Sequence, residues 1–408
     1  MLPPDDQVIY PRTPVSWVVI SVTLTLIGIA AFLYGTSGSH ALRTWQAFTV
    51  NYIFWAGLAF GGVLFSAVLN LSKAVWGRPV KRLAESFSAY LPVSFLLFWV
   101  FLMGKEHVFP WVLKPVQEKQ DFLNAPFMFA REGVCLFALT VLCLVFVYFS
   151  VKGDRQWLKA GRPHVSTEYP WLGYFRAQWR LSPVLPAAYA FILSLFAVDL
   201  IMSLSPDWIS TLFPGYYFTA AFYSAIAAIY LLVLLTKDRL GLDPYLLSRQ
   251  FHDMGKLIFG FAIFTGYLFY AQLLVIWYGN LPEETRFVIL RTKLDPWKPW
   301  AWAVLFMIFG IPFLALLSRN IKVKRVPMIF ITIMILAGMW MERFLLIVPS
   351  LWDRPGIPFG LLEVLVSAGF FGLVWLCITA FLSRVPVMPV SDPLFHKFLK
   401  QSEGSLKP

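Results

Sequence analysis

The sequence predicts an all-α polytopic membrane protein with about ten transmembrane helices, and two features point to that class. First, 59% of the 408 residues are hydrophobic and 14% are charged, whereas soluble globular domains have roughly 45–50% apolar and about 25% charged residues. Second, the apolar residues gather in ten runs. Each run is long enough to cross a hydrocarbon core of roughly 30 Å as a helix.

The ten predicted helices account for most of the chain and leave no room for a separate soluble domain. The longest connecting segments are residues 105–131 and 152–182. We therefore treat residues 1–408 as one integral membrane domain. The predicted spans cover residues 15–35, 46–73, 80–104, 132–151, 183–205, 213–236, 250–279, 297–318, 326–348 and 358–383.

The distribution of basic residues predicts the orientation. Ten spans place both termini on one side, and 22 of the 34 Lys and Arg residues fall on that side, against 10 on the other. Loops rich in Lys and Arg face the cytoplasm, so both termini are expected there. The net charge of +12 is spread over these short loops, which indicates membrane orientation rather than nucleic acid binding.

The sequence offers no site for a redox cofactor. A haem b in a helical bundle needs axial ligands, usually His, that project inward from the helices, and no histidine is predicted near the middle of a span. The cysteines form no C-x-x-C or C-x-x-C-H pattern, which argues against iron–sulfur clusters and covalently attached haem. We expect no catalytic residue and no metal site. The residues concerned are His40, His107, His164, His252, His396, Cys135, Cys143 and Cys377.

Charged residues inside the spans are the main functional clue, because such residues are rare in membranes and are usually paired or functional. Asp199 lies 16 residues into the fifth span, or about 24 Å along a helix. Glu342 and Arg343 reach a similar depth in the ninth span, and Glu363 lies near the outer end of the tenth. Since Glu342 and Arg343 are adjacent, we expect them to face different ways. Residues at the outer ends of the third and fourth spans extend this layer, namely Glu106, His107, Arg131 and Glu132.

A second polar cluster lies at the cytoplasmic start of the seventh span and contains His252, Asp253 and Lys256. Asp253 and Lys256 are three residues apart and therefore share one helix face. Tyr267 falls within about 60° of that face. Polar residues on this face therefore continue across the membrane. Between Lys256 and Tyr267 the face is apolar, and water or a neighbouring helix would have to fill this gap.

These residues also have structural interpretations. Asp253 and Lys256 could form an interfacial ion pair, and Glu342 or Arg343 could pair across helices for packing alone. Tyr267 could pack rather than relay protons. Asp199 has no basic neighbour in its own helix, which favours a role in proton transfer or quinone binding for this residue.

Two longer runs carry a resemblance to a known family. One comprises DMGKLIF at residues 253–259, YLFYAQ at 267–272 and IWYGNLPEET at 276–285. The other comprises FAVDLIMSLSPDW at residues 196–208 and STLFPGYYF at 210–218. Both runs resemble the NrfD/PsrC-like membrane subunits of alternative complex III, a quinol:cytochrome c oxidoreductase, and the second, F-type subunit more than the larger one.

The resemblance implies an arrangement and a set of partners. Helices two to five and six to nine would form two four-helix bundles, with the first and tenth helices peripheral. The partners would be a homologous quinol-binding membrane subunit, an iron–sulfur subunit and a multihaem cytochrome c. The c haems and clusters would lie in those partners, in a bacterial cytoplasmic membrane and a respiratory or photosynthetic chain.

The resemblance also implies that this subunit contributes proton half-channels. Asp253, Lys256 and His252 would serve the inner half, with Tyr267 further along the same face. The outer half would be served by Asp199, Glu342, Arg343 and Glu363. The chain itself would then be either non-catalytic or a subunit that contributes a quinone site.

Three alternatives stay open. The chain could be the quinone-binding membrane anchor of a molybdopterin-type reductase, or a scaffold whose charges are merely paired. It could also be a secondary transporter, although no pair of Gly/Pro-broken helices lies at the midplane of corresponding halves, as such transporters usually have.

Overall fold

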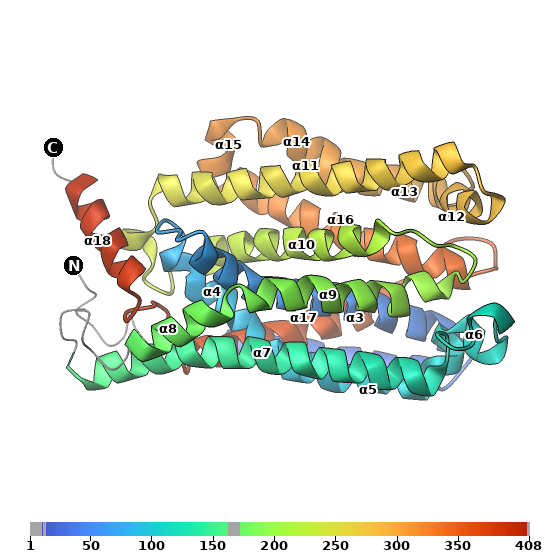
Figure 1. The fold of residues 1–408 in the computed structure, drawn as a ribbon, viewed down its shortest axis with the longest axis horizontal. Coiled ribbons are helices and arrows are strands. Elements are labelled where there is room, and N and C mark those ends of the chain that lie inside the picture. The colour runs from blue at the N-terminus through green and yellow to red at the C-terminus, as the bar shows by residue number, and fades with distance from the viewer. Residues whose placement is uncertain (1–9, 11–13, 162–171, 406–408) are drawn as a thin grey trace.

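Ten long helices lie side by side in the computed structural model, all roughly parallel or antiparallel (Figure 1). The structure describes residue 10 and residues 14–161 and 172–405. No β-strand occurs in this part of the chain, and the predicted all-α class with ten membrane-length helices is confirmed. Several residues used to predict orientation or exclude haem lie outside the described residues, namely Arg12, Arg162, His164 and Lys407.

The membrane-length segments follow the predicted order. They are α2 (Val15–Thr36), α3 (Ala41–Leu71), a third segment (Arg78–Val108), α7 (Ala125–Lys159), a fifth segment (Leu172–Leu204), α10 (Phe213–Thr236), α11 (Ser248–Gly279), an eighth segment (Trp297–Ala315), α16 (Arg325–Leu351) and α17 (Leu361–Leu382). The composite segments contain η1 (Arg78–Val80), α4 (Lys81–Glu85), η2 (Ser86–Tyr90), α5 (Leu91–Val108), α8 (Leu172–Leu181), α9 (Val184–Leu200), η4 (Met202–Leu204), α13 (Trp297–Leu305), η6 (Phe306–Gly310) and α14 (Ile311–Ala315). Shorter helices outside these segments are α6 (Pro110–Leu113), η3 (Gln117–Lys119), η5 (Asp243–Tyr245), α12 (Pro282–Thr292), α15 (Arg319–Val323) and α18 (Pro393–Ser405).

The fourth span differs most from its predicted boundaries. Residues 132–151 were expected, but α7 has 35 residues and extends beyond the apolar run at both ends. It begins after Asn124, whose side chain accepts a hydrogen bond from the Phe127 N–H (3.4 Å), as an N-cap residue does. Hydropathy locates the part of a helix that lies in lipid, and it does not locate the end of the helix.

The helices form two four-helix bundles. The first bundle contains α3, α5, α7 and α9, and the second contains α10, α11, α13–α14 and α16. The two bundles meet along α3 and α10, which are the most buried of the ten spans. Outside them, α2 packs along α17, and α17 packs on α3.

Small residues set the distance between the two bundles. A Cβ atom at Gly61 of α3 would lie 2.7 Å from the Cβ of Ala225 and 3.2 Å from the carbonyl oxygen of Ala221, both in α10. Such close backbone approach is how membrane helices gain packing energy without a hydrophobic driving force between them.

The helix ends define two poles of the molecule. The start of α2 and the end of α17 lie at the same pole as α18, while α6 and α12 lie at the opposite pole (Figure 1). Following the predicted orientation, we name these the cytoplasmic and the outer end.

Gly61→Leu is expected to destabilise the protein, because the larger side chain must force α3 and α10 apart. Overpacking of this kind costs about 1–3 kcal/mol. We expect a lower thermal midpoint for the purified variant in detergent. Gly215→Leu in α10 is the matched control, since a Cβ there would meet no atom within 4 Å. Equal midpoints for the two variants would contradict this account of the interface.

Candidate functional site

Asp199 is the centre of a buried ion pair at the outer end of the first bundle. Its carboxylate accepts two hydrogen bonds from Arg131 of α7, from Nε to Oδ2 (2.9 Å) and from Nη2 to Oδ1 (2.6 Å). The Asp199 side chain is fully buried and that of Arg131 is 14% exposed. The basic partner that α9 lacks is thus supplied by the second turn of α7.

Glu132 adds a second carboxyl group to this site. It is fully buried, and it lies within electrostatic reach of Asp199. Neither of its oxygens makes a hydrogen bond of normal geometry with a described residue. One guanidinium balances one carboxylate, and a second ionised carboxylate without a partner costs several kcal/mol when it is buried. We name Arg131, Glu132 and Asp199 the outer carboxyl cluster; with two carboxyl groups beside one guanidinium, this arrangement favours a shared proton.

The outer carboxyl cluster lies close to the outer surface. The Arg131 guanidinium carbon is 4.0 Å from the ring centre of Phe122 and 4.8 Å from that of Phe127. Phe122 also lines an open cavity of about 310 Å³, which we name the outer vestibule. Other residues of the outer vestibule include Glu118, Asp121, Met202, Ser203 and Trp208. One aromatic ring thus lies between the cluster and the vestibule.

Buried hydroxyl groups continue from the outer carboxyl cluster toward the cytoplasmic end. Tyr52 of α3 lies within electrostatic reach of Glu132 and close to the hydroxyl of Ser94 in α5. Ser94 also lies close to Tyr90, at the end of η2. All three side chains are at most 2% exposed. We name Tyr52, Ser94 and Tyr90 the hydroxyl row.

An ionic network closes the cytoplasmic end of the first bundle. Arg78 donates to Asp392 (2.8 Å) and to Asn70 (2.7 Å), and Lys81 also donates to Asp392 (3.1 Å). Arg82 bridges Glu85 and Asp154. The six charged residues of this inner ionic network are each at most 3% exposed, namely Arg78, Lys81, Arg82, Glu85, Asp154 and Asp392. Three cations face three carboxylates, so the network is balanced.

The inner ionic network also fixes the C-terminal segment. Asp392 lies just before α18, and the side chain and N–H of Ser391 both bond Asp154 Oδ1 (2.6 and 2.8 Å). Burial raises the pKa of Asp392, but Lys81 and Arg78 outweigh this effect, so its pKa lies below the ordinary value. The segment before α18 is thereby held against α4 and α7.

Sequence reasoning missed the inner ionic network and used its basic residues only as markers of the cytoplasmic side. Arg78, Lys81 and Arg82 do follow the second span, but η1 and α4 fold that segment into the bundle. A partial signal was available, because Arg82 and Glu85 have helical i,i+3 spacing. The decisive partner, Asp392, lies 314 residues from Arg78 in the chain, and no local pattern reveals it.

Glu342 and Arg343 correct one expectation. They were expected to face different ways, but Arg343 Nη1 donates directly to Glu342 Oε2. Both side chains are at most 5% exposed. The guanidinium also lies over the ring of Tyr217, 4.6 Å from its centre. In a buried setting the long Arg side chain turns back along α16 to its nearest anion, which outweighs the divergence of the two Cβ positions.

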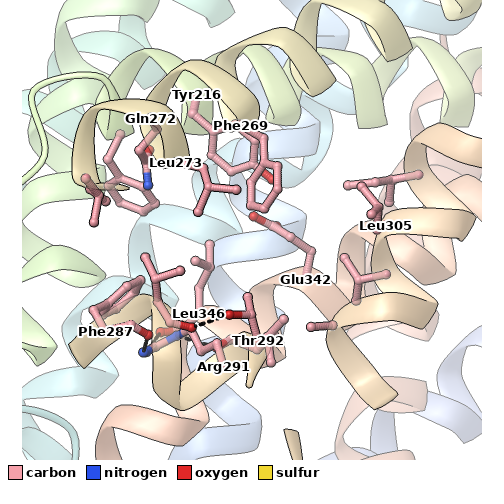
Figure 2. A pocket seen from close by; sticks show the side chains of 17 residues that line it. Tyr216, Phe269, Gln272, Leu273, Phe287, Arg291, Thr292, Leu305, Glu342 and Leu346 are labelled. Carbon is pink, nitrogen blue, oxygen red and sulfur yellow. Dashed lines mark hydrogen bonds between the residues drawn. The ribbon is translucent and has the colours of Figure 1, made fainter. Parts of the chain in front are cut away.

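Glu342 also faces a cavity of about 90 Å³ in the second bundle, and one of its oxygens has no hydrogen-bond partner among the described residues. Figure 2 shows this side chain reaching from α16 toward Tyr216 and Phe269. The lining is mostly apolar, with Gln272 of α11 as a further polar group. We name this space the second-bundle cavity.

Arg291 lines the same cavity and has a structural task. Its Nε donates to the carbonyl of Leu345 (2.9 Å) and its Nη2 to that of Leu346 (2.8 Å). Pro349 lies inside α16, and because proline has no N–H, it cannot bond the Leu345 carbonyl four residues earlier. Arg291 from α12 therefore satisfies a carbonyl that α16 leaves free.

Glu363 is held by a different partner. Arg43 donates to both of its oxygens (2.9 and 2.8 Å), and the Gly360 N–H donates to Oε2 (2.7 Å). These bonds cap α17 and tie it to α3. A role of Glu363 in proton transfer stays a prediction.

The residues predicted to form the inner half-channel, all on α11, lie apart from these clusters. Lys256 Nζ donates to Asp253 Oδ1 (3.0 Å), as their spacing indicated. The Lys256 side chain is 56% exposed and Tyr267 is 61% exposed. His252 is half-buried beside them. The structure thus brings Asp253 and Lys256 together but directs this face of α11 away from both bundles.

A family model described as polysulphide reductase, NrfD, matches residues 35–352. The matched range begins at the end of α2 and ends just after α16, so it contains both four-helix bundles. No curated protein matches the chain.

Asp392→Asn is expected to release the C-terminal segment, because Arg78 and Lys81 lose their shared anion. Breaking a buried pair from one side costs about 3–5 kcal/mol. We expect faster protease cleavage before α18 in inside-out membrane vesicles at neutral pH. Asp243→Asn is the control, since that side chain is 48% exposed.

The wild-type segment should respond to pH in a defined direction. The pKa of Asp392 is lower in the folded protein than in the unfolded chain. Its ion pairs therefore stabilise the segment above the unfolded value of about 3.9, and this stabilisation is lost as the pH falls through the folded value. Cleavage that rises instead between pH 6 and 8, near the ordinary His pKa of about 6.5, would contradict the assignment.

Proposed function

The chain belongs to the NrfD family, and on that premise we propose that it is a membrane subunit of an alternative complex III. In this proposal, partner subunits oxidise quinol and pass the electrons to an acceptor, and this chain provides a path for protons and a scaffold. The observation that carries the proposal is the outer carboxyl cluster, where two buried carboxyl groups share one guanidinium.

The outer carboxyl cluster has the properties of a proton-loading site. The affinity of a buried carboxyl for a proton depends strongly on the nearest charge. While Arg131 bonds Asp199, the remaining proton resides on the Glu132 side. A shift of the Arg131 guanidinium toward Glu132 would move the proton to Asp199, and a second cation nearby would expel it into the outer vestibule.

A partner on the outer side is well placed to cause such a shift. Phe122, in the segment between α6 and α7, and Phe127, in the first turn of α7, both contact the Arg131 guanidinium. Phe122 also lines the outer vestibule. We propose that a redox-linked change in a cofactor-bearing partner moves this segment, so that the segment is the two-state element that coupling requires.

The hydroxyl row supports an inner half-route through the first bundle. Tyr52, Ser94 and Tyr90 lead from the outer carboxyl cluster to the end of η2, and Tyr90 lies five residues after Glu85 of the inner ionic network in the chain. We favour this route over one along His252, Asp253, Lys256 and Tyr267, because Lys256 and Tyr267 are exposed on the outside of α11. That face would need a covering partner before it could conduct protons.

The cofactors in this proposal belong to the partners. An iron–sulfur subunit, a multihaem cytochrome c and a homologous quinol-binding subunit would carry out electron transfer. Among the described residues of this chain, no group of three or more His, Cys, Asp and Glu side chains could hold a metal ion.

Glu132→Gln is expected to abolish proton translocation and to preserve electron transfer. The substitution leaves the Arg131–Asp199 pair intact and removes the carboxyl that shares the proton. We would measure protons released per quinol oxidised by the purified complex in liposomes. Asp199→Asn should give the same loss, and Asp207→Asn, on the exposed outer loop, should behave as wild type.

Three outcomes separate the candidate roles. Loss of translocated protons at normal turnover supports the proton path. Unchanged proton release in both Glu132→Gln and Asp199→Asn contradicts it and favours a scaffold. Loss of turnover itself assigns the cluster to quinol chemistry.

The second-bundle cavity favours a second candidate function, that of a quinone-binding anchor of a molybdopterin-type reductase. Its apolar lining would suit a quinone ring, and Gln272 and Glu342 would supply polar contacts. Leu305→Trp would fill this cavity from α13. Our primary proposal predicts unchanged quinol turnover for this variant, whereas a loss of turnover with normal assembly supports the quinone anchor.

A further inference from the structure

The outward side of α11 carries a polar stripe through the membrane. Nine residues of α11 lie within about 40° of one line along the helix, at 100° per residue. Besides Arg249, His252 and Leu274, six of them run from Lys256 to Tyr278. These six residues, which we name the α11 outward face, are Lys256, Gly260, Ile263, Tyr267, Tyr270 and Tyr278. All six are exposed.

Helix α2 offers a comparison, because its large exposed side chains are apolar except for Tyr34 near its end. Both α2 and α11 are among the least buried of the ten spans. The large exposed side chains of α2 include Val19, Leu26, Ile29 and Leu33, and no charged residue occurs anywhere in this helix. Lipid alone therefore does not account for the composition of the α11 outward face.

Two hydroxyl groups of the α11 outward face lie at membrane depth without partners. Tyr267 is 19 residues from the start of α11 at Ser248, or about 28 Å along the helix, and Tyr270 follows within one turn. They are 61% and 60% exposed, and neither hydroxyl has a hydrogen-bond partner among the described residues. A hydroxyl in hydrocarbon without a hydrogen bond costs roughly 2–7 kcal/mol, depending on the reference state.

Gly260 points to close approach by another helix. A Cβ atom at this position would meet nothing within 4 Å, whereas one at Gly266 would lie 2.7 Å from the Phe309 ring. Packing inside this chain therefore explains Gly266 and leaves Gly260 unexplained. Small residues on an outward helix surface let a second transmembrane helix come close.

The charges at the cytoplasmic end of the α11 outward face argue against a second copy of this chain as the occupant. Lys256 and Arg249 share one anion there, Asp253. The neighbouring α15 adds the exposed Arg319. A two-fold axis along the membrane normal would bring equal depths together, so these basic residues would meet and repel each other. An acidic partner suits this end better.

We propose that the α11 outward face is the docking surface for a transmembrane helix of a different membrane subunit. That helix would pack against Gly260, accept hydrogen bonds from Tyr267 and Tyr270, and place an acidic side chain near Lys256. The proposal is independent of proton transfer, because it concerns the outside of the second bundle and not the outer carboxyl cluster.

Photo-crosslinking in native membranes tests the occupant directly. A benzophenone amino acid would replace Tyr267 in the full-length chain, and Leu26 of α2 would carry the same probe as the control, since it is 60% exposed on the apolar side. We expect position 267 to crosslink to a transmembrane peptide of a polytopic subunit that also co-purifies in fixed ratio with the wild-type chain. Position 26 should crosslink to lipid.

A crosslink from position 267 to lipid, to a second copy of this chain or to a peripheral protein would overturn the proposal. Gly260→Leu provides a second test, because no atom of the described residues lies within 4 Å of a Cβ at this position. We expect this variant to retain its fold and to lose about tenfold of the co-purifying subunit. Ala30→Leu, on the exposed side of α2, should retain it. Full retention in Gly260→Leu would also overturn the proposal.

Discussion

The rest of the structure depends on one constraint, which is that a charge away from water must find its counter-charge within the protein. Most buried charges in the described residues meet this constraint, although Arg291 donates to backbone carbonyls instead. Glu363 has Arg43, Glu342 has Arg343, and the six charges of the inner ionic network balance one another. Glu132 is different, because Asp199 already occupies the Arg131 guanidinium beside it. The proposed proton path rests on this surplus carboxyl group.

The two bundles divide the polar groups between them. The first bundle has an ionic group at each end, and the hydroxyl row lies between them in an otherwise mostly apolar interior. The second bundle instead contains a mostly apolar cavity, and Arg291 bonds the carbonyl that Pro349 leaves free. The close contact of α3 with α10 at Gly61 joins the two.

The fold was largely predictable from the sequence, and the site was predictable only in part. Hydropathy and the positive-inside bias are local or additive signals, so ten helices could be placed before any contact was known. Depth along a helix identified Asp199 as an outer-layer residue. The ion-pair partners could not be predicted, because Arg131 and Asp392 contact their partners through the tertiary structure and not at a regular sequence spacing. The position of the α11 outward face likewise could not be predicted, because it depends on which side of α11 packs inside the second bundle.

Infrared difference spectroscopy of the purified complex gives the most direct test of the central claim, that Glu132 carries an exchangeable proton in the outer carboxyl cluster. Protonated carboxyl groups have a C=O stretch that ionised groups lack, and ²H₂O shifts it when the proton exchanges. The account predicts a deuterium-sensitive carboxylic acid band in the wild type that changes on quinol oxidation and disappears in Glu132→Gln. An unchanged band in that variant, or no band that responds to quinol, would contradict the account.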